Sequence, residues 1–431
     1  MKKQHIDTRC IQEGYKPKNG EPRVMPLYQS TTFKYDSAEH VGDLFDLKAD
    51  GHMYTRISNP TLECVESKIA ALEGGVGAML TASGMSAILI SILNVAKSGD
   101  SIISTTAIYG GTVTLLTAEL SRLNIEVIFV DPDISVEELQ NKIKPNTRMI
   151  FGETIANPAL TILDIEKFAK VAHANGIPLM LDNTFPTPIL CRPFEFGCDI
   201  VIHSTTKYMD GHASALGGCI VDSGRFNWKN GKFPEFTEPN AAYHGVVFAD
   251  DFGEAAFIAK ARTVLMRDFG VSASPFNAYI LNLGLETLHL RMERHCKNAI
   301  KVAKYLESKI ADGKVSWINY PGIESSKDYE LAKKYIRTED GEFIGAAGVI
   351  SFGVAGGREK AMQFMNKLKL ATIVVHVADL RTSALHPASM THRQLTDEQL
   401  VAAGITPDLV RFSVGIENSN DIIADIEQAL N

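Results

Sequence analysis

Between about residues 60 and 220, the chain alternates short runs rich in isoleucine and valine with segments of helical periodicity. We predict six strands here, at residues 76–81, 101–105, 125–130, 149–152, 177–182 and 199–203. Strands that are apolar on both faces and linked by helices are typical of a mostly parallel sheet covered on both sides. This part of the chain is therefore predicted to be α/β.

One helix in this region has a clear beginning and end. Asn59-Pro60 provides a start signal and Gly74-Gly75 a stop signal. Between them, four apolar residues recur at helical spacing: Leu62, Val65, Ile69 and Leu72. We predict an amphipathic helix over residues 61–72.

The pattern changes after about residue 265. A long helical stretch is predicted over 275–310, followed by strands near 348–354, 372–376 and 409–414 and by a C-terminal helix over 420–430. Segment 225–251 fits neither pattern and is predicted to be a long ordered excursion. We divide the chain into an N-terminal segment 1–60, a large domain 61–265 that includes the excursion, and a smaller α+β domain 266–431.

Composition excludes several classes of protein. The formal net charge of −8 gives no reason to expect nucleic acid or an anionic membrane as partner. The first residues are polar, and no apolar run approaches the roughly 20 residues that span a bilayer. Six scattered cysteines without a Cys-x-x-Cys pair indicate reduced thiols, and hence a cytoplasmic location. No pair of histidines has helical spacing beside an acidic residue, so no metal site is predicted.

Reactive side chains follow the last two predicted strands of the α/β region. Asp182 ends one strand, and Ser204, Thr206 and Lys207 follow the next. In an α/β sheet, functional groups gather beyond the carboxyl ends of the strands. The sequence therefore predicts a carboxylate, hydroxyls and a primary amine in one crevice.

These groups suit pyridoxal phosphate. A lysine amine forms a Schiff base with the cofactor aldehyde, and burial near cations lowers its pKa as this requires. The ring nitrogen stays protonated only beside a buried carboxylate, for which Asp182 is the candidate. Ser204 and Thr206 alternate ahead of Lys207, so both hydroxyls can face a phosphate. A small-residue turn, Ser83-Gly84-Met85, opens a helix whose amides can approach a phosphate; alone this signal is weak, because such turns are common.

The chain resembles the Cys/Met-metabolism branch of the fold-type I pyridoxal-phosphate enzymes over nearly its whole length. The motifs that carry the resemblance are Tyr-Thr-Arg at 54–56, Ser-Gly-Met at 83–85, Ala-Ile-Tyr-Gly-Gly-Thr at 107–112, Leu-Asp-Asn-Thr-Phe at 181–185, His-Ser-Thr-Thr-Lys-Tyr at 203–208, His-Pro-Ala-Ser-Met-Thr-His at 386–392 and Val-Arg-Phe-Ser-Val-Gly-Ile-Glu at 410–417. The resemblance implies an aminotransferase-like fold, in which the large domain holds a mostly parallel seven-stranded sheet.

The resemblance also implies roles for individual residues. Lys207 would hold the cofactor and move protons on the substrate, and Tyr109 would stack on the ring and assist. The cofactor-binding set would be Lys207, Asp182, Ser83, Gly84, Met85, Tyr109, Asn157, Ser204, Thr206, Tyr54 and Arg56. Arg411 would bind the substrate α-carboxylate, with Tyr54 and Asn157 as further substrate contacts. Tyr54 and Arg56, in the arm 1–60, would reach the phosphate of a neighbouring subunit, which makes the active unit a homodimer and favours a homotetramer.

Within this branch, three details favour O-acetylhomoserine sulfhydrylase activity. The excursion 225–251 resembles an insertion in those enzymes; Gly111 stands where methionine γ-lyases usually have cysteine; and Arg381 stands where transsulfuration enzymes tend to have glutamate. The expected reaction replaces acetate on Cγ of O-acetyl-homoserine by sulfide or methanethiol, giving homocysteine or methionine.

Alternatives stay open at this point. They are a methionine γ-lyase-type elimination, a non-catalytic role as a cofactor-binding or sulfur-relay scaffold, a protein thiocarboxylate as sulfur donor, and succinyl in place of acetyl. His376 departs from the family pattern, which has serine or asparagine near the substrate carboxylate. His386 and His392 are interpreted as structural supports and His203 as a local hydrogen-bonding residue.

Overall fold

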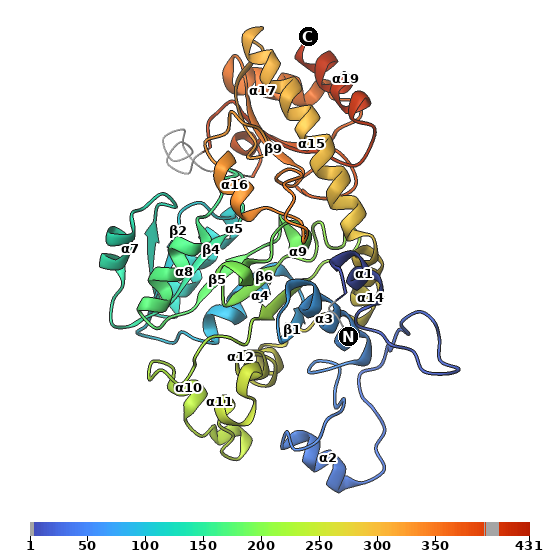
Figure 1. The fold of residues 1–431 in the computed structure, drawn as a ribbon, viewed down its shortest axis with the longest axis vertical. Coiled ribbons are helices and arrows are strands. Elements are labelled where there is room, and N and C mark those ends of the chain that lie inside the picture. The colour runs from blue at the N-terminus through green and yellow to red at the C-terminus, as the bar shows by residue number, and fades with distance from the viewer. Residues whose placement is uncertain (1–3, 392, 394–404) are drawn as a thin grey trace.

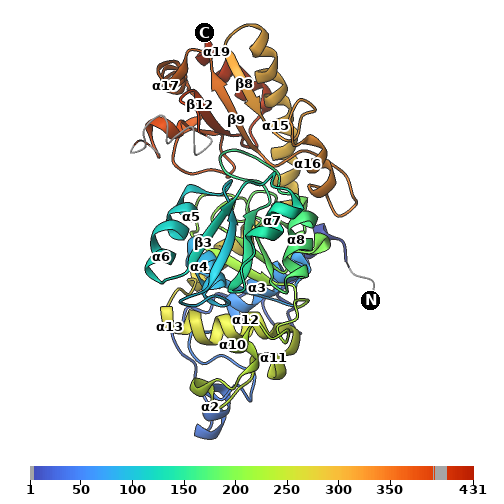
Figure 2. The same cartoon turned by 90° about the vertical axis from the view of Figure 1, so that its left-hand side faces the viewer.

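The computed structural model describes residues 4–391, 393 and 405–431. Figures 1 and 2 show a molecule elongated along one axis, with a C-terminal sheet at one end and a larger sheet in the middle. Helices α2 (Ala38–Phe45), α10 (Pro234–Thr237) and α11 (Phe248–Asp251) lie at the opposite end. The two sheets are the frame on which the candidate site is built.

The larger sheet has seven strands. In spatial order they are β1 (Gly77–Thr81), β7 (Gly218–Asp222), β6 (Ile200–His203), β5 (Leu179–Asp182), β4 (Thr147–Glu153), β2 (Ser101–Thr105) and β3 (Glu126–Val130). From β6 to β3 every pair is parallel, whereas β7 is antiparallel to both β6 and β1. Every residue of β2, β6 and β7 is buried. The predicted mostly parallel sheet, covered on both faces, is confirmed.

Strand β7 is the one strand of this sheet that periodicity did not predict. It follows the Lys207 segment without an intervening helix, and it runs antiparallel between β1 and β6. A prediction that looks for strands alternating with helices misses such a strand. The other six predicted strands lie within two residues of the observed bounds.

The α-helices within the described residues are α1 (Ile6–Gln12), α2, α3 (Pro60–Glu73), α4 (Gly84–Leu93), α5 (Gly110–Thr114), α6 (Leu120–Arg122), α7 (Val136–Lys142), α8 (Ile165–Ala174), α9 (Thr187–Leu190), α10, α11, α12 (Ala256–Lys260), α13 (Arg267–Phe269), α14 (Pro275–Glu286), α15 (Leu288–Ala311), α16 (Tyr329–Tyr335), α17 (Gly357–Lys367) and α19 (Ser419–Leu430). Two π-helical segments, η1 (Leu115–Glu119) and η5 (Ala261–Met266), continue α5 and α12. Helices α3 and α4 pack on β1 and β7, and α8 packs on β4 and β5.

Helix α3 shows how sequence signals set the bounds of an element. The Asn59 side chain accepts a hydrogen bond from the Thr61 amide, and Pro60 occupies the first helical position. Gly74 ends the helix at φ +82°, a left-handed conformation that glycine adopts without steric cost. The four apolar residues predicted to share a face are all buried: Leu62, Val65, Ile69 and Leu72.

The smaller sheet has five strands, in the order β10 (Thr372–Ile373), β11 (Ser383–Leu385), β12 (Leu409–Ser413), β9 (Val349–Val354) and β8 (Val315–Asn319). All its pairs are antiparallel except β10 with β11. Strands β8 and β11 were not predicted, and the predicted helical stretch 275–310 is broken at Thr287 into α14 and α15. Helix α14 packs on α3 and α1, whereas α15 packs on β8 and β9.

The excursion 225–251 is held to helix α12 by aromatic rings. Trp228 stacks on Phe236 with ring centroids 4.3 Å apart and on Phe257 of α12 at 5.4 Å. Phe233 meets the edge of Trp228 at 5.1 Å. Offset and edge-to-face pairs of this kind add to the stability that buried area provides.

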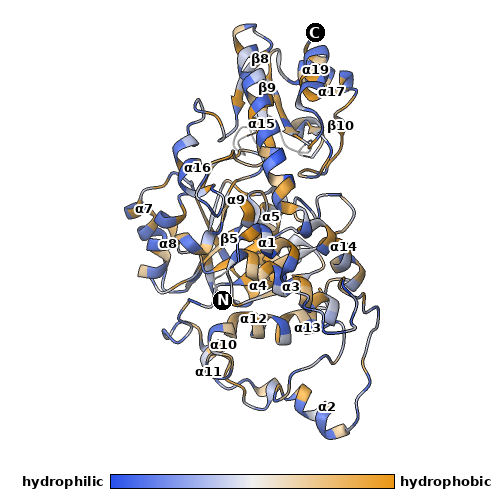
Figure 3. Ribbon diagram, turned by 45° about the vertical axis from the view of Figure 1, so that its right-hand side comes forward, coloured by the Kyte–Doolittle hydropathy of each residue, from blue (hydrophilic) through white to orange (hydrophobic). Residues whose placement is uncertain are grey.

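Helix α4, which packs on the large sheet, is more apolar than helices at the outside of the molecule. In Figure 3, α4 is mostly orange along its length, whereas α7 and α16 at the outside show more blue. Within the described residues, no helix combines the length and the apolar character that crossing a bilayer requires.

Candidate active site

Three groups of the site come from the carboxyl ends of neighbouring parallel strands in the large sheet, and two of them, Asp182 and Lys207, were predicted. Glu153 ends β4 and is paired in register with Asp182, which ends β5. Strand β6 ends at His203, and Lys207 follows four residues later. The strand order therefore places two carboxyl groups and the Lys207 segment side by side at one edge of the sheet.

Lys207 has the properties of a reactive amine. Burial and the nearby Arg411 guanidinium lower the pKa of Lys207 to about 8, against an opposing effect of Asp379. Its Nζ lies 3.3 Å from Nδ1 of His376, which belongs to the smaller part of the molecule. An amine with a lowered pKa is more often unprotonated at neutral pH, as bond formation with an aldehyde requires.

Arg291, which the sequence did not single out, fixes the backbone that follows Lys207. This buried residue of α15 donates from Nη1 to the carbonyl of Tyr208 (2.5 Å) and from Nη2 to that of Met209 (3.2 Å). The same Nη2 donates to the carbonyl of Gly284 in α14 (2.5 Å). The sequence of α15 contains no local signal that one of its cations would contact the segment after Lys207.

The amino end of α4 presents two free amide groups. Ser83 caps the helix, accepting from the Ser86 amide through Oγ at 3.1 Å and from the Ala87 amide through its carbonyl at 3.1 Å. The amides of Gly84 and Met85 have no hydrogen-bond partner within the described chain. Helix amino ends with free amides bind anions, because the unpaired N–H groups and the helix dipole act together.

Gly84 brings this helix end against the segment after β6. A Cβ at position 84 would lie 2.8 Å from Cβ of Ser204, so only glycine allows the present approach. The Ser204 hydroxyl has no protein partner in the described residues, whereas Thr206 Oγ1 donates to the Gly217 carbonyl (3.1 Å) and accepts from its amide (3.0 Å). The structure thus brings Ser83, Gly84 and Ser204 together, as predicted, and directs the Thr206 hydroxyl toward backbone.

Glu153 organises the neighbouring part of the site and was missed by the sequence reading. Its Oε1 accepts from the Tyr109 amide (2.6 Å) and its Oε2 from the Asn157 amide (3.2 Å). The Tyr109 side chain is 48% exposed, and a Cβ at Gly111 would lie 2.5 Å from its ring. Glycine at 111 therefore permits this ring position. The predicted strand 149–152 ended one residue before Glu153, which hid an acidic residue at a strand end.

The two carboxyl groups of this edge influence each other. Burial and the proximity of Asp182 raise the pKa of Glu153 well above its usual value. Burial likewise raises the pKa of Asp182, against hydrogen bonds from Thr184. No described cationic side chain forms an ion pair with Asp182, so a protonated ring nitrogen would supply the charge that this carboxylate lacks.

Arg411 reaches the site from β12. It is 7% exposed, and burial lowers its pKa to about 10. Its guanidinium donates to Asn157 Oδ1 (3.3 Å) and to the carbonyls of Val375 (3.2 Å) and His376 (3.3 Å). No carboxylate of the described chain pairs with it. A buried guanidinium without an anionic partner is suited to binding a carboxylate from a ligand.

Tyr54 and Arg56 lie on the surface, apart from the groups above. The Arg56 guanidinium lies 5.4 Å from the centroid of the Tyr54 ring and donates to the Arg267 carbonyl. The Tyr54 side chain is 43% exposed. Neither side chain hydrogen-bonds to Lys207, Asp182 or the start of α4 in the described chain.

Two histidines have structural partners. His386 is buried, and its ring nitrogens lie 2.7 Å from Ser389 Oγ and 2.8 Å from the Pro407 carbonyl oxygen. His203 is buried against Glu73, with Nε2 and Oε1 2.6 Å apart, a partner distant in sequence rather than local. His392 lies outside the described residues. Arg381, exposed, donates to the His212 carbonyl (3.4 Å).

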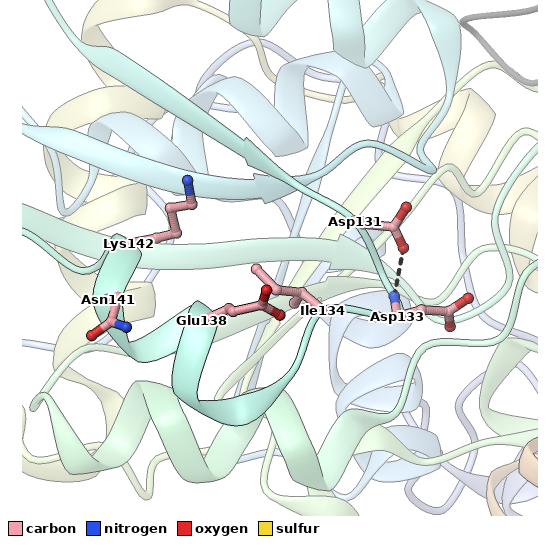
Figure 4. A pocket seen from close by; sticks show the side chains of 6 residues that line it. All are labelled: Asp131, Asp133, Ile134, Glu138, Asn141 and Lys142. Carbon is pink, nitrogen blue, oxygen red and sulfur yellow. Dashed lines mark hydrogen bonds between the residues drawn. The ribbon is translucent and has the colours of Figure 1, made fainter.

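A shallow surface pocket elsewhere is lined by carboxylates. Figure 4 shows Asp131, Asp133 and Glu138 around it, between the end of β3 and helix α7. The Asp133 amide donates to Asp131 Oδ1 (2.7 Å). Over the residues that the structure describes, no cluster of three histidine, cysteine or acidic side chains could hold a metal ion.

Comparison with known proteins identifies the family. The family model for Cys/Met metabolism PLP-dependent enzymes matches residues 7–431, and the chain belongs to this family. It is 44% identical to homocysteine synthase of Schizosaccharomyces pombe, over 100% of this chain and 99% of that protein. It is 45% identical to O-acetyl-L-homoserine sulfhydrylase of Leptospira meyeri, over 95% of this chain and 92% of that protein.

Solved structures give the same result for the fold. An O-acetylhomoserine (thiol)-lyase from Campylobacter jejuni, which carries N'-pyridoxyl-lysine-5'-monophosphate, superposes with a TM-score of 0.93 at 35% identity, covering 99% of this chain and 100% of that one. The metB protein from Corynebacterium glutamicum gives 0.83 at 34% identity, covering 99% and 98%. The fold is therefore that of the fold-type I pyridoxal-phosphate enzymes, and the protein is a pyridoxal-phosphate-dependent enzyme.

The residues present fit this cofactor. The free amides of Gly84 and Met85 and the Ser204 hydroxyl suit its phosphate, and the buried Asp182 suits its ring nitrogen. Lys207 offers the amine. The assignment of each contact to a particular residue stays a prediction, which the experiments below address.

Proposed function

We propose that the protein is an O-acetyl-L-homoserine sulfhydrylase, an enzyme that replaces acetate on Cγ of its substrate by a thiol. The proposal rests on the relatives, which are a homocysteine synthase and several O-acetyl-L-homoserine sulfhydrylases at 41–45% identity over nearly the whole chain. Sulfide would give homocysteine and methanethiol would give methionine. The protein would act in the cytoplasm, where its six free cysteines, five of them buried, would stay reduced.

The observation that carries the proposal is that Lys207, beside the large sheet, and Arg411, on β12 of the smaller sheet, both contact His376. Lys207, with its lowered pKa, and the unpaired guanidinium of Arg411 lie close enough for Arg411 to depress the pKa of Lys207. An α-amino acid presents a carboxylate and an amine one carbon apart. Arg411 would bind the carboxylate, which places Cα and its proton beside Lys207.

Pyridoxal phosphate, when bound, withdraws electrons from the substrate carbon atoms and so makes their protons acidic. Lys207 would take and return the protons at Cα and Cβ, as a general base and acid. Glu153 would hold the Tyr109 amide and thereby the ring above Gly111, and Asn157 would hold the Arg411 guanidinium. Acetate would leave from Cγ, and the thiol would add there.

We further propose that the active unit is a homodimer, which pairs into a homotetramer. Tyr54 and Arg56 are exposed, and neither side chain hydrogen-bonds to Lys207, Asp182 or the start of α4 in the described chain, which supports a role in a neighbouring subunit's phosphate site. The arm 1–60 would carry both residues across, while 61–265 would form the cofactor domain and 266–431 the smaller domain. Symmetric dimers of this kind are the commonest homo-oligomers.

The test is steady-state turnover of O-acetyl-homoserine by the purified protein with and without sulfide, following homocysteine and 2-ketobutyrate. The proposal predicts homocysteine that depends on sulfide and little ketoacid. Ketoacid release without any thiol would instead assign a γ-elimination. Parallel reactions with methanethiol, with a protein thiocarboxylate donor and with O-succinyl-homoserine define the thiol and the acyl group.

A further inference from the structure

His376 contacts Lys207 in a way that the proposed reaction does not yet use. Nδ1 of the imidazole lies 3.3 Å from Lys207 Nζ. On the other side of the ring, Nε2 lies 3.7 Å from Asp379 Oδ2, and it has no hydrogen-bond partner in the described chain although it is buried. The three groups form a row of amine, imidazole and carboxylate, the order in which a proton moves through an acid–base relay.

The loop that carries His376 is anchored on both sides of the site. The Ala378 amide donates to Ser413 Oγ (2.8 Å) at the end of β12. The Leu380 amide donates to the carbonyl of Gly211 (2.9 Å), four residues after Lys207. The Arg381 amide donates to Asp379 Oδ1 (2.7 Å). The His376 ring is therefore positioned by backbone contacts on the very segments that hold Lys207 and Arg411.

The charges around the imidazole favour its neutral form, which can accept a proton. Burial, Lys207 and Arg411 lower the pKa of His376, whereas Asp379 and Asp210 raise it. A cation formed on the ring would face the Asp379 carboxylate at once. Because the pKa of His376 is lowered and that of Lys207 is about 8, the proton rests mainly on Lys207 and its transfer to the ring is transient.

We propose that His376 is a catalytic residue that accepts a proton from the Lys207 ammonium through Nδ1 and later returns it, with Asp379 as a positioning residue that stabilises the imidazolium. In this step the Nζ–H bond of Lys207 breaks, its electron pair stays on Nζ, and the proton forms a bond to Nδ1. The unprotonated amine is then ready to take a proton from the substrate. This proposal rests on the proposed function and adds a partner that transiently removes a proton from Lys207.

The first test reads the shared proton without any activity measurement. Diethyl pyrocarbonate acylates only neutral imidazole, and mass spectrometry of the full-length protein without bound cofactor gives the extent at His376 across a pH series. The side chain is 21% exposed but its Nε2 is buried, so acylation is followed over extended times in which local opening admits the reagent, and the extents are compared at equal times. Lys207→Ala removes a neighbouring positive charge, so the His376 profile shifts to higher pH. Asp379→Asn removes a negative charge, so the profile shifts to lower pH.

His5 provides the internal control. It is the N-cap of α1, and its side chain is 41% exposed. Its acylation profile stays the same in both variants, because neither charge is near it. Identical His376 profiles in the wild type, Lys207→Ala and Asp379→Asn would overturn the shared proton.

The second test measures catalysis in the cofactor-loaded enzyme. His376→Asn keeps a polar side chain of the type expected in the family but does not titrate, and its kcat with O-acetyl-homoserine and sulfide falls at least ~10²-fold while KM changes little. The visible absorbance of the bound cofactor checks that the site is intact. The matched control is His5→Asn, in which asparagine remains a good N-cap, and it keeps wild-type kcat.

Failure of the proposed function and failure of the proposed role of His376 give different results. Wild-type enzyme that does not turn over O-acetyl-homoserine contradicts the proposed function, whatever the acylation profiles show. Wild-type turnover that His376→Asn retains in full contradicts the role of His376 and leaves the proposed function standing.

Discussion

The two sides of the site present different chemical groups. The side formed by the large sheet uses backbone amides at the start of α4, a glycine contact between Gly84 and Ser204, and carboxyl groups at strand ends. The side formed by β12 and the loop before β11 uses a buried guanidinium and an imidazole. We propose from this difference that the sheet side binds the cofactor, whereas the other side binds the substrate and lowers the pKa of Lys207.

Loss of Lys207 is expected to have the largest effect, because this residue faces both sides. Lys207→Ala should lower kcat by about 10⁴-fold, the upper range for an acid–base group, and it should abolish covalent attachment of the cofactor. The measurement is turnover together with cofactor retention after borohydride reduction and gel filtration under denaturing conditions.

Lys260 is a stringent control for that variant. Burial lowers its pKa also to about 8, yet it donates to the carbonyl and side chain of Asn94 in the core at 2.8 Å and 3.1 Å. Lys260→Met should keep the covalent cofactor. Loss of attachment in Lys260→Met with retention in Lys207→Ala would reverse the assignment.

Changing Arg411 should affect the substrate side alone. Arg411→Lys keeps the charge but loses the planar, bidentate contact with a carboxylate. A hydrogen bond to a charged group contributes about 1.5–3 kcal/mol, so KM for O-acetyl-homoserine should rise ~10–100-fold. The bound cofactor's absorbance should be unchanged; a variant that binds substrate normally but loses cofactor would contradict the division between the two sides.

Filling the contact at Gly84 should affect the cofactor side alone. Gly84→Ala places a Cβ 2.8 Å from Cβ of Ser204, and overpacking of this kind costs about 1–3 kcal/mol. Cofactor should dissociate more readily on dilution, with KM for the amino acid little changed in the loaded fraction. Gly42→Ala in α2 meets no atom within 4 Å and serves as the neutral control. Equal cofactor retention in both variants would remove the proposed phosphate contact.

The smallest expected effect is a pH dependence of stability from Glu153. Its pKa is raised by burial and by Asp182, so its neutral form is favoured in the folded chain. That contribution is fully present below the pKa of an unfolded glutamate and is lost as pH rises through the raised folded value. Wild-type protein without cofactor should therefore lose thermal stability relative to Glu153→Gln on going from acidic toward neutral pH. A difference in Tm that is constant with pH would contradict the buried carboxyl pair.

Sequence periodicity was sufficient for the groups that follow strands. Asp182 and Lys207 were placed at the same sheet edge because the carboxyl ends of parallel strands meet there. Glu153 was missed because the predicted strand ended one residue too early. Strand β7 was missed because it lacks the preceding helix that the alternating pattern requires.

Contacts between distant segments could not be predicted in the same way. Arg291 supports the carbonyls of Tyr208 and Met209 from a helix that is distant in sequence. The pairing of His376 with Lys207 joins residues 169 positions apart. Such contacts depend on how the smaller sheet packs against the larger one, which no local pattern encodes. The resemblance placed Arg411 near a substrate carboxylate, but its burial and its contact with Asn157 needed the structure.

The most direct test of the account is to find the lysine that carries the cofactor. Borohydride reduction of the purified enzyme converts a lysine Schiff base into a stable pyridoxyl-lysine, which peptide mass spectrometry locates. We expect the pyridoxyl group on Lys207 and not on Lys260, which is more deeply buried. Modification of Lys260, of another lysine, or of none would contradict it.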